Sequence, residues 1–223
     1  MDMGAQRVVE FYFDPVSPYA WLASTQLDRV ATMAGMSVKA VPVLLAVLLD
    51  HFGNQGPAEI PVKRSYAIRD AMRRAKRYRV SFEGPPTHPF NPLLALRCAT
   101  AIRDDGQQWA FTKTMLRSAW EQGLDVTVAA ILESIASQCG LDGAKLLTDA
   151  NDATNKAALA QSTAHAIELG IFGVPTLRVD GENFWGEDRL DDLLVWLEGG
   201  LRVDEDVYRR VLERPASAQR KRV

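Results

Sequence analysis

The opening of the chain restricts the fold more than any other part, because it alternates strand, helix and strand patterns. Val8 to Phe13 (VVEFYF) is almost wholly apolar and rich in β-branched and aromatic residues, as in a strand that is buried on both faces. Asp14-Pro15 ends this run, and Ser17-Pro18 begins a helical pattern that continues to about Ala34. Ser37 to Val43 is a second strand-like run. A β-α-β order of this kind predicts a parallel or mixed sheet with a right-handed crossover.

The middle of the chain differs from both ends, because it carries helical patterns and no convincing strand. Gly123, Gly140 and Gly170 stand where helices would end. We expect five helices in this region, over residues 62–79, 91–105, 107–122, 127–140 and 153–169.

Strand patterns return near the end of the chain. Residues 175–179 and 183–185 flank Asp180-Gly181, a strong hairpin signal, and a final helix is expected over 187–198. The complete order predicts an α/β, thioredoxin-like fold with an inserted all-helical domain. The predicted boundaries are 1–60 and 170–200 for the thioredoxin-like domain, 61–169 for the inserted helical domain and 201–223 for a loose C-terminal tail.

The charge balance and the apolar runs exclude several classes of protein. With 26 basic and 28 acidic residues the net charge is −2, so the chain as a whole has no general attraction to nucleic acid or to anionic membranes. The longest apolar run, Ala40 to Leu49, has about half the length of a membrane span, and the amino terminus lacks the pattern of a signal peptide. We therefore expect a cytoplasmic protein without nucleic-acid or membrane partners.

Cysteine and histidine do not form the patterns of redox or metal sites. The two cysteines, Cys98 and Cys139, fall within predicted helices and form neither a Cys-x-x-Cys pair nor a disulfide framework, which fits a reducing compartment. His51, His88 and His165 have no partner at metal-ligand spacing. We expect no metal site and no catalytic cysteine.

The first candidate site residue is Ser17, at the turn before the first helix. In a thioredoxin-like fold the redox cysteines begin at this helix N-terminus, where the helix dipole lowers the pKa of a thiol. The corresponding residues here are Ser17-Pro18-Tyr19-Ala20, so disulfide chemistry is excluded at this position, and a hydroxyl remains where a thiolate would be stabilised. The alternative is that Ser17 is only the N-cap of the helix.

Two later segments would lie beside this turn in a thioredoxin-like topology. Pro175 is the first residue of a strand-like run, a position typical of a turn or a cis bond, and a cis bond would leave the N–H and C=O of Val174 open to an extended peptide. The alternative is an ordinary proline at a strand entry. Glu187 and Asp188 begin the last helix, where they either complement the helix dipole or bind an ammonium group.

Together, the segments FYFDPVSPYAWLA, FGVPT and FWGEDRLDDLL resemble the motifs of the kappa-class glutathione transferase and 2-hydroxychromene-2-carboxylate isomerase family, relatives of the DsbA-type thioredoxin-like proteins. The resemblance extends from about residue 8 to residue 200, and it implies a DsbA-like fold with glutathione as cofactor. It also implies a role for each site residue. Ser17 would interact with the glutathione thiol, Val174 ahead of Pro175 would pair with the glutathione backbone, Glu187 and Asp188 would hold the γ-glutamyl end, and Gly53-Asn54 would also contribute.

The resemblance implies an activity as well. The WGxDRL form of the third motif favours the isomerases, so we expect a homodimeric, glutathione-dependent cis–trans isomerase of 2-hydroxychromene-2-carboxylate or a related small-molecule aromatic carboxylate. A kappa-like glutathione transferase or peroxidase and a non-catalytic thioredoxin-like binding module remain open as alternatives. Two stretches depart from the family pattern: residues 44–51 (LLAVLLDH), which are more apolar, and residues 84–90 (GPPTHPF).

Overall fold

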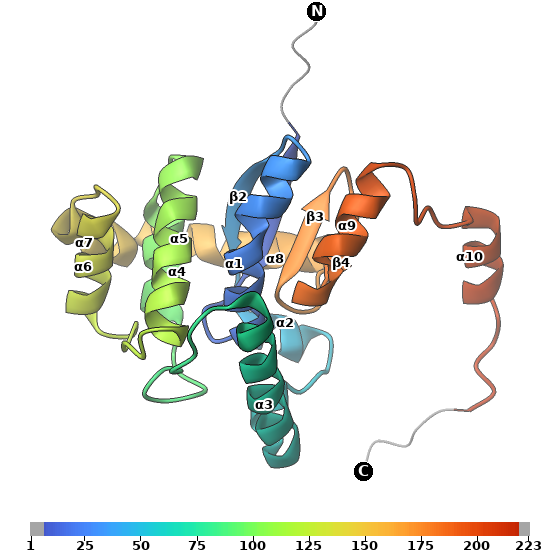
Figure 1. Cartoon of the computed structure of the whole chain (residues 1–223), viewed down its shortest axis with the longest axis horizontal. Coiled ribbons are helices and arrows are strands. Elements are labelled where there is room, and N and C mark those ends of the chain that lie inside the picture. Colours follow the sequence, from blue (N-terminus) through green and yellow to red (C-terminus); the bar gives the residue numbers. More distant parts are fainter. Residues whose placement is uncertain (1–6, 219–223) are drawn as a thin grey trace, which may run out of the picture.

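A four-stranded mixed sheet lies at the centre of the computed structural model, which describes residues 7–218 (Figure 1). The strands are β1 (Val8–Phe13), β2 (Ser37–Pro42), β3 (Thr176–Val179) and β4 (Glu182–Trp185), in the spatial order β2-β1-β3-β4. β1 and β2 are parallel, whereas β3 is antiparallel to both β1 and β4. The predicted mixed sheet is confirmed, and so is the hairpin, in which Asp180 and Gly181 both have positive φ.

The predicted helices are present, with ends that differ by a few residues. α1 (Pro18–Met33) connects β1 to β2, and α9 (Leu190–Leu197) follows β4 after the short 3-10 helix η2 (Glu187–Arg189). The five helices expected in the middle of the chain are α3 (Pro61–Tyr78), α4 (Leu93–Ala101), α5 (Asp105–Trp120), α6 (Ala129–Gln138) and α8 (Ala153–Glu168). A further 3-10 helix, η1 (Pro57–Glu59), precedes α3.

Three short helices lie where the sequence patterns predict none: α2 (Leu45–His51), α7 (Gly143–Asn151) and α10 (Glu205–Leu212). An aspartate side chain caps the start of two of them, because Asp142 accepts a hydrogen bond from the N–H of Lys145 in α7, and Asp204 caps α10 in the same way. The tail that was predicted to be loose therefore contains a helix, and Figure 1 shows α10 apart from the rest of the fold. Residues 1–6 and 219–223, the predicted signal-free amino terminus and the end of the tail, lie outside the described residues.

Both faces of the sheet are buried, as the apolar pattern of β1 predicts. On one face Phe11 and Phe13 pack against α1 and α5, and the ring of Phe11 meets Trp109 edge to face at 5.7 Å. On the other face Tyr12 packs with residues of α2 and α8, and Figure 1 shows α8 running behind the sheet. The first of these cores continues without interruption through α4, α5, α6 and α7. The helical segment, residues 61–169, therefore packs against the sheet that carries the candidate site.

No helix in residues 7–218 combines the length and the apolar character that crossing a bilayer requires.

Candidate functional site

The register of the sheet brings the three candidate segments to one edge. Tyr12 of β1 pairs with Thr176, the first residue of β3, and Thr176 pairs with Trp185, the last residue of β4. The turn after β1, the turn before β3 and the turn after β4 therefore lie together. Loops at a shared strand end are a common place for ligand sites in α/β folds.

Ser17 stands at the N-terminus of α1 and is buried, with 7% of its surface exposed. Its Oγ accepts a hydrogen bond of 3.2 Å from the backbone N–H of Ala20, so the serine is an N-cap. A hydroxyl can also donate one hydrogen bond, and among residues 7–218 no acceptor takes the hydrogen of Ser17. The cap therefore leaves the hydroxyl hydrogen free for a ligand, and the two interpretations of Ser17 are compatible.

Asp14 fixes the turn that carries Ser17. Its carboxylate is 1% exposed and accepts hydrogen bonds of 3.0 Å from the backbone N–H groups of Val16 and Leu45, the first residue of α2. Burial raises the pKa of the Asp14 carboxyl to about 6, and the two N–H donors oppose this rise. One side chain thus connects the turn to the start of α2.

Two side chains from the helical segment hold the same turn. Trp120 of α5 donates a hydrogen bond of 3.0 Å from its indole nitrogen to the carbonyl of Pro15. His88 lies with Nε2 3.0 Å from the carbonyl oxygen of Val16, which requires a hydrogen on Nε2. Burial lowers the pKa of His88, so the ring is neutral near pH 7. Its Nδ1 is buried and has no hydrogen-bond partner among the described residues.

The Val174–Pro175 peptide bond is cis, as one of the two sequence interpretations predicted. The carbonyl of Pro175 accepts a hydrogen bond of 2.9 Å from the N–H of Gly186, which ties this turn to the turn after β4. Neither the N–H nor the C=O of Val174 is hydrogen-bonded within residues 7–218. Val174 therefore offers the two backbone groups that an extended peptide needs in order to pair with it.

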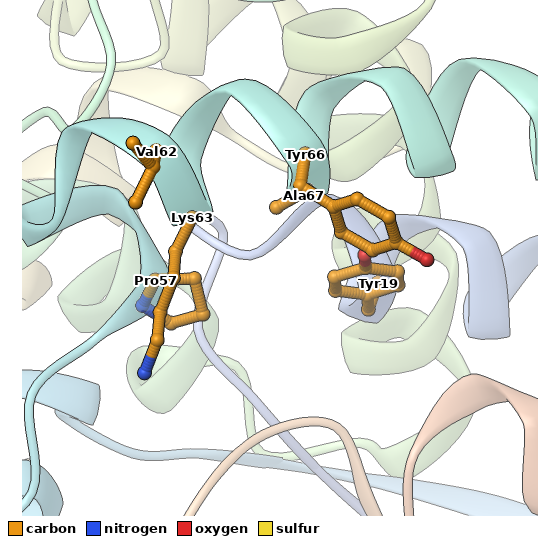
Figure 2. Close-up of a pocket in the computed structure, with 6 residues that line it drawn as sticks. All are labelled: Tyr19, Pro57, Val62, Lys63, Tyr66 and Ala67. Carbon is orange, nitrogen blue, oxygen red and sulfur yellow. The ribbon is translucent and has the colours of Figure 1, made fainter.

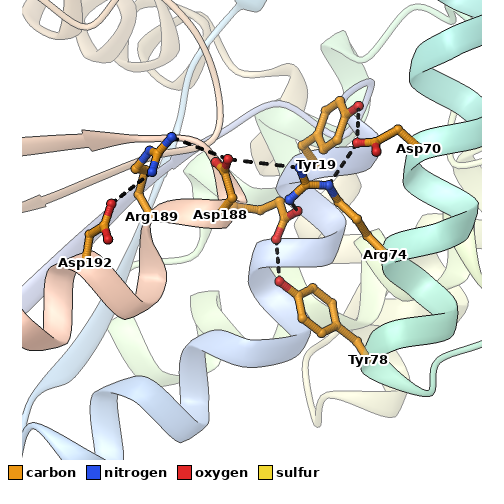
Figure 3. Close-up of polar contacts among 8 residues, drawn as sticks. Tyr19, Asp70, Arg74, Tyr78, Asp188, Arg189 and Asp192 are labelled. Atoms are coloured by element: carbon orange, nitrogen blue, oxygen red, sulfur yellow. Dashed lines mark hydrogen bonds and ion pairs between the residues drawn. The ribbon is translucent and has the colours of Figure 1, made fainter.

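The turn after β4 places its two acidic residues in different environments (Figure 3). Glu187 is 2% exposed, and its carboxylate accepts hydrogen bonds from Arg74 and, at 2.6 Å, from the hydroxyl of Tyr78. The Asp188 side chain is 44% exposed, 4.0 Å from Arg74 and 3.5 Å from Arg189. Of the two predicted contacts to the γ-glutamyl end, only Asp188 has a carboxylate that a ligand can reach.

The same arginine connects this turn to the first helix. Asp70, one helical turn before Arg74 in α3, accepts hydrogen bonds from Arg74 at 2.8 Å and from the hydroxyl of Tyr19 at 3.1 Å. The Arg74 guanidinium also lies 5.9 Å from the centre of the Tyr19 ring. Tyr19 is two residues beyond Ser17, so α3 contacts both the first and the third candidate segments.

A shallow cavity of about 290 Å³ lies between α1, η1 and α3 (Figure 2). Its wall is mainly apolar and contains two aromatic rings and one amine; the lining residues are Tyr19, Pro57, Val62, Lys63, Tyr66 and Ala67. A cavity with this lining suits a small aromatic molecule that carries a negative charge.

The remaining predicted residues lie away from these contacts. Asn54 is exposed between α2 and η1, and its backbone N–H donates a hydrogen bond of 2.8 Å to the carbonyl of Leu49. Cys98 is buried in α4, and burial raises the pKa of its thiol to about 12. Cys139, at the end of α6, lies 3.6 Å from the hydroxyl of Thr114. Neither sulfur takes part in the contacts of the three turns.

Sequence patterns miss several residues that shape the site. The strand pattern identifies Asp14 only as the end of a strand, although an aspartate in a turn often accepts a hydrogen bond from the backbone N–H two residues later, as Asp14 does from Val16. Asp70, Arg74 and Tyr78 follow one another at intervals of four residues, which places them on one face of α3. This spacing is visible in the sequence. Their partner Glu187 is more than 100 residues away, and no local pattern identifies it.

Known proteins share both the sequence pattern and the fold. The sequence profile described as a DSBA-like thioredoxin domain matches residues 8–198. The 2-hydroxychromene-2-carboxylate isomerase of Sphingobium xenophagum is 28% identical over 194 residues, which cover 86% of this chain and 98% of that protein. Glutathione S-transferase kappa 1 of Rattus norvegicus is 28% identical over 209 residues, which cover 87% of this chain and 92% of that protein.

A solved structure of selenomethionine-labelled 2-hydroxychromene-2-carboxylate isomerase has the same fold. It superposes with a TM-score of 0.81 at 24% identity, and the match covers 90% of this chain and 98% of that one.

Proposed function

This chain belongs to the DsbA-like thioredoxin domain family, and we propose that it is a glutathione-dependent cis–trans isomerase of 2-hydroxychromene-2-carboxylate or a related aromatic-degradation intermediate. One observation carries the proposal. A serine hydroxyl with a free hydrogen stands at the N-terminus of α1, at the sheet edge where the cis-proline turn presents the open backbone of Val174. A thiol-disulfide oxidoreductase needs a cysteine pair at this helix start, and this chain has none there.

The donors and acceptors of the three turns fit glutathione. Val174 can pair with the peptide backbone of the ligand, and the cis bond to Pro175 sets the orientation of the Val174 backbone. Asp188 can pair with the ammonium of the γ-glutamyl end. Asn54 would contribute its exposed side-chain amide. It follows α2, whose first residue, Leu45, is hydrogen-bonded to Asp14 in the Ser17 turn. For Glu187 the proposal differs from the sequence expectation, because its carboxylate is occupied by Arg74 and Tyr78.

When bound, glutathione supplies a thiolate that can add to a conjugated double bond of the substrate, permit rotation about the resulting single bond and leave again. Ser17 keeps the sulfur ionised, because its free hydroxyl hydrogen can be donated to a negatively charged acceptor. The N–H groups at the start of α1 add favourable electrostatic energy at the same place. The aromatic carboxylate would bind in the cavity beside Tyr19 and Tyr66, with Lys63 as the partner of its negative charge.

A second candidate function is a kappa-like glutathione transferase or peroxidase, since the rat kappa enzyme has the same 28% identity as the Sphingobium isomerase. The two reactions differ in what happens to glutathione, which the isomerase regenerates and the transferase consumes.

The test is to follow the absorbance of 2-hydroxychromene-2-carboxylate with and without glutathione while free thiol is titrated over many turnovers. We expect glutathione-dependent isomerisation with a constant thiol concentration. Loss of thiol in proportion to product would establish the transferase instead. Calorimetry that detects no binding of glutathione would reject both and favour a non-catalytic binding module.

We propose in addition that the protein acts as a cytoplasmic homodimer. The support for a reducing compartment is that Cys98 and Cys139 are both free thiols. Light scattering of the purified protein tests the homodimer, and a mass equal to a single chain would reject it.

A further inference from the structure

Six side chains from three parts of the chain form one connected group, which we term the Arg74 cluster (Figure 3). Its members are Asp70, Arg74 and Tyr78 of α3, Tyr19 of α1, and Glu187 and Asp188 of η2. Arg74 is the centre, because it contacts all of the others except Tyr78.

Burial makes the pairing of Glu187 obligatory. A carboxylate in a protein interior costs several kcal/mol in lost hydration unless cations and hydrogen-bond donors replace the water. The Glu187 side chain is 1% exposed, whereas that of Arg74 is 32% exposed. Arg74 and Tyr78 supply the replacement, so the position of Glu187 follows the position of α3.

Asp188 is the next residue in the chain, so the contacts that fix Glu187 against α3 also restrict the position of the Asp188 backbone. Gly186, before the pair, has a φ of 117°, a conformation that allows the turn but does not by itself hold it. From α3, Tyr78 contacts Glu187 only, whereas Arg74 contacts both Glu187 and the Asp188 carboxylate. On the other side of the cluster, Asp70 holds the hydroxyl of Tyr19 two residues beyond Ser17.

From these contacts we infer that Arg74 is a positioning residue for glutathione: it holds the Gly186–Asp188 turn through Glu187 and the start of α1 through Asp70 and Tyr19. The inference rests on the proposed function. It assigns the affinity for glutathione in part to an arginine of the helical segment that is hydrogen-bonded to Asp70 and Glu187.

The test replaces Arg74 and compares it with its neighbour in the same helix. Arg73 is exposed and forms no ion pair among the described residues, so Arg73→Met is the matched control for Arg74→Met. Arg74→Met should raise the Kd for glutathione about tenfold, while Arg73→Met keeps the wild-type Kd. Turnover at saturating glutathione should stay within about twofold of wild type, because Asp14 and Trp120 still hold the turn that carries Ser17 when Arg74 is replaced. Arg74→Lys keeps the charge but loses the two-pronged contact and should fall between the two.

Hydrogen exchange of the free protein provides a readout that needs no ligand. The amides of residues 186–189 should exchange faster in Arg74→Met than in Arg73→Met. If Arg74→Met does not fold, the double variant Arg74→Met, Glu187→Gln removes both charges and keeps an acceptor for Tyr78, and it should also bind glutathione more weakly.

The outcomes separate the inference from the proposed function. A wild-type protein that does not bind glutathione overturns both. A wild-type protein that binds, together with a folded Arg74→Met or double variant that binds equally well, overturns only the role of Arg74. An equal loss of turnover at saturating glutathione would also contradict it, because a positioning residue for binding acts on Kd.

Discussion

At the scale of single residues, Ser17 combines the cap of α1 with a free hydroxyl hydrogen, and these two roles can be separated by substitution. An unperturbed cysteine-type thiol has a pKa of about 8.5. A hydrogen bond to a charged acceptor contributes about 1.5–3 kcal/mol, which corresponds to roughly one to two pKa units. Ser17→Ala should therefore raise the pKa of the bound glutathione thiol by that amount. Turnover should fall at neutral pH and partly recover at higher pH, as measured by thiolate absorbance and by initial rates.

The control for this substitution is Ser17→Thr, which keeps a hydroxyl and should keep a thiol pKa near that of the wild type. Loss of the cap alone lowers the free energy of unfolding by about 0.5–2 kcal/mol. An Ala variant with this loss of stability but an unchanged thiol pKa and unchanged turnover would show that Ser17 is only a cap.

Asp188 should act in binding and not in the chemical step. Its side chain is 44% exposed, so water screens part of any attraction to the glutathione ammonium, and we expect Asp188→Asn to weaken binding about tenfold. Turnover at saturating glutathione should change little. Isothermal titration measures the effect, with Asp191→Asn, an exposed aspartate in α9, as the control. Equal affinities of the two variants would remove Asp188 from the site.

The cysteines should be dispensable for activity. Burial raises the pKa of the Cys98 thiol to about 12, which makes it a poor nucleophile, and Cys139 is remote from the three turns. The double variant Cys98→Ala, Cys139→Ala should keep glutathione-dependent turnover within about twofold once its lower stability is taken into account. A folded double variant without activity would place a cysteine in the reaction.

At the scale of elements, the turn between β1 and α1 should give the protein a pH-dependent stability through Asp14. Its folded-state pKa of about 6 lies above the ordinary value of 3.8, so the folded protein binds this proton more tightly than the unfolded chain does. The resulting stabilisation is complete below pH 3.8 and is lost as the pH rises through 6. The size of the loss is about 3 kcal/mol.

Asp14→Asn removes this ionisation and keeps one of the two acceptor contacts to Val16 and Leu45. The stability of the wild type relative to this variant should therefore decrease between pH 4 and pH 7. Urea unfolding at several pH values measures it, and Asp50→Asn, an exposed aspartate in α2, is the control. A difference that stays constant over this range would mean that Asp14 is ionised throughout.

The elements also show what local sequence can predict. Strong periodic segments, such as β1 and the long helices α1, α3 and α8, were predicted close to their observed bounds, because hydrophobic periodicity and capping are local signals. The short helices α2, α7 and α10 were not, since seven to nine residues carry too few turns for a clear period. The helices α4 and α9 are equally short, but Asn91-Pro92 before α4 and Gly199-Gly200 after α9 mark a helix start and a helix end in the sequence.

The candidate site likewise has a part that local sequence predicts and a part that it does not. The positions of Ser17 and Val174-Pro175 follow from turn chemistry next to predicted strands, and the sheet register then brings them together. The burial of Glu187 depends on Arg74 and Tyr78, which approach from a helix more than 100 residues earlier. A contact of that kind is decided by packing, so an acid at a helix start looks the same in sequence whether it faces a ligand or the interior.

At the scale of the whole molecule, the sheet and the helical segment share one core, and this predicts how the protein unfolds. The rings of Phe11 and Trp109 join β1 to α5 at 5.7 Å, and the rings of Trp21 and Trp120 join α1 to α5 at 6.3 Å. Neither part can lose its structure without exposing the apolar surface of the other. We therefore expect a single cooperative transition, although the sequence was divided into a thioredoxin-like domain and an inserted domain.

Two probes report on different parts of the fold during urea unfolding. Far-ultraviolet circular dichroism follows mainly the helices. Tryptophan fluorescence follows all five tryptophans, of which Trp21, Trp109 and Trp120 lie at the junction with the sheet, and the other two lie in β4 and α9. The two curves should coincide. Phe11→Ala removes one side of the junction and should lower the free energy of unfolding by about 3–5 kcal/mol while shifting both curves equally. Two separate transitions, or a shift of the fluorescence curve alone, would show that the helical segment folds independently of the sheet.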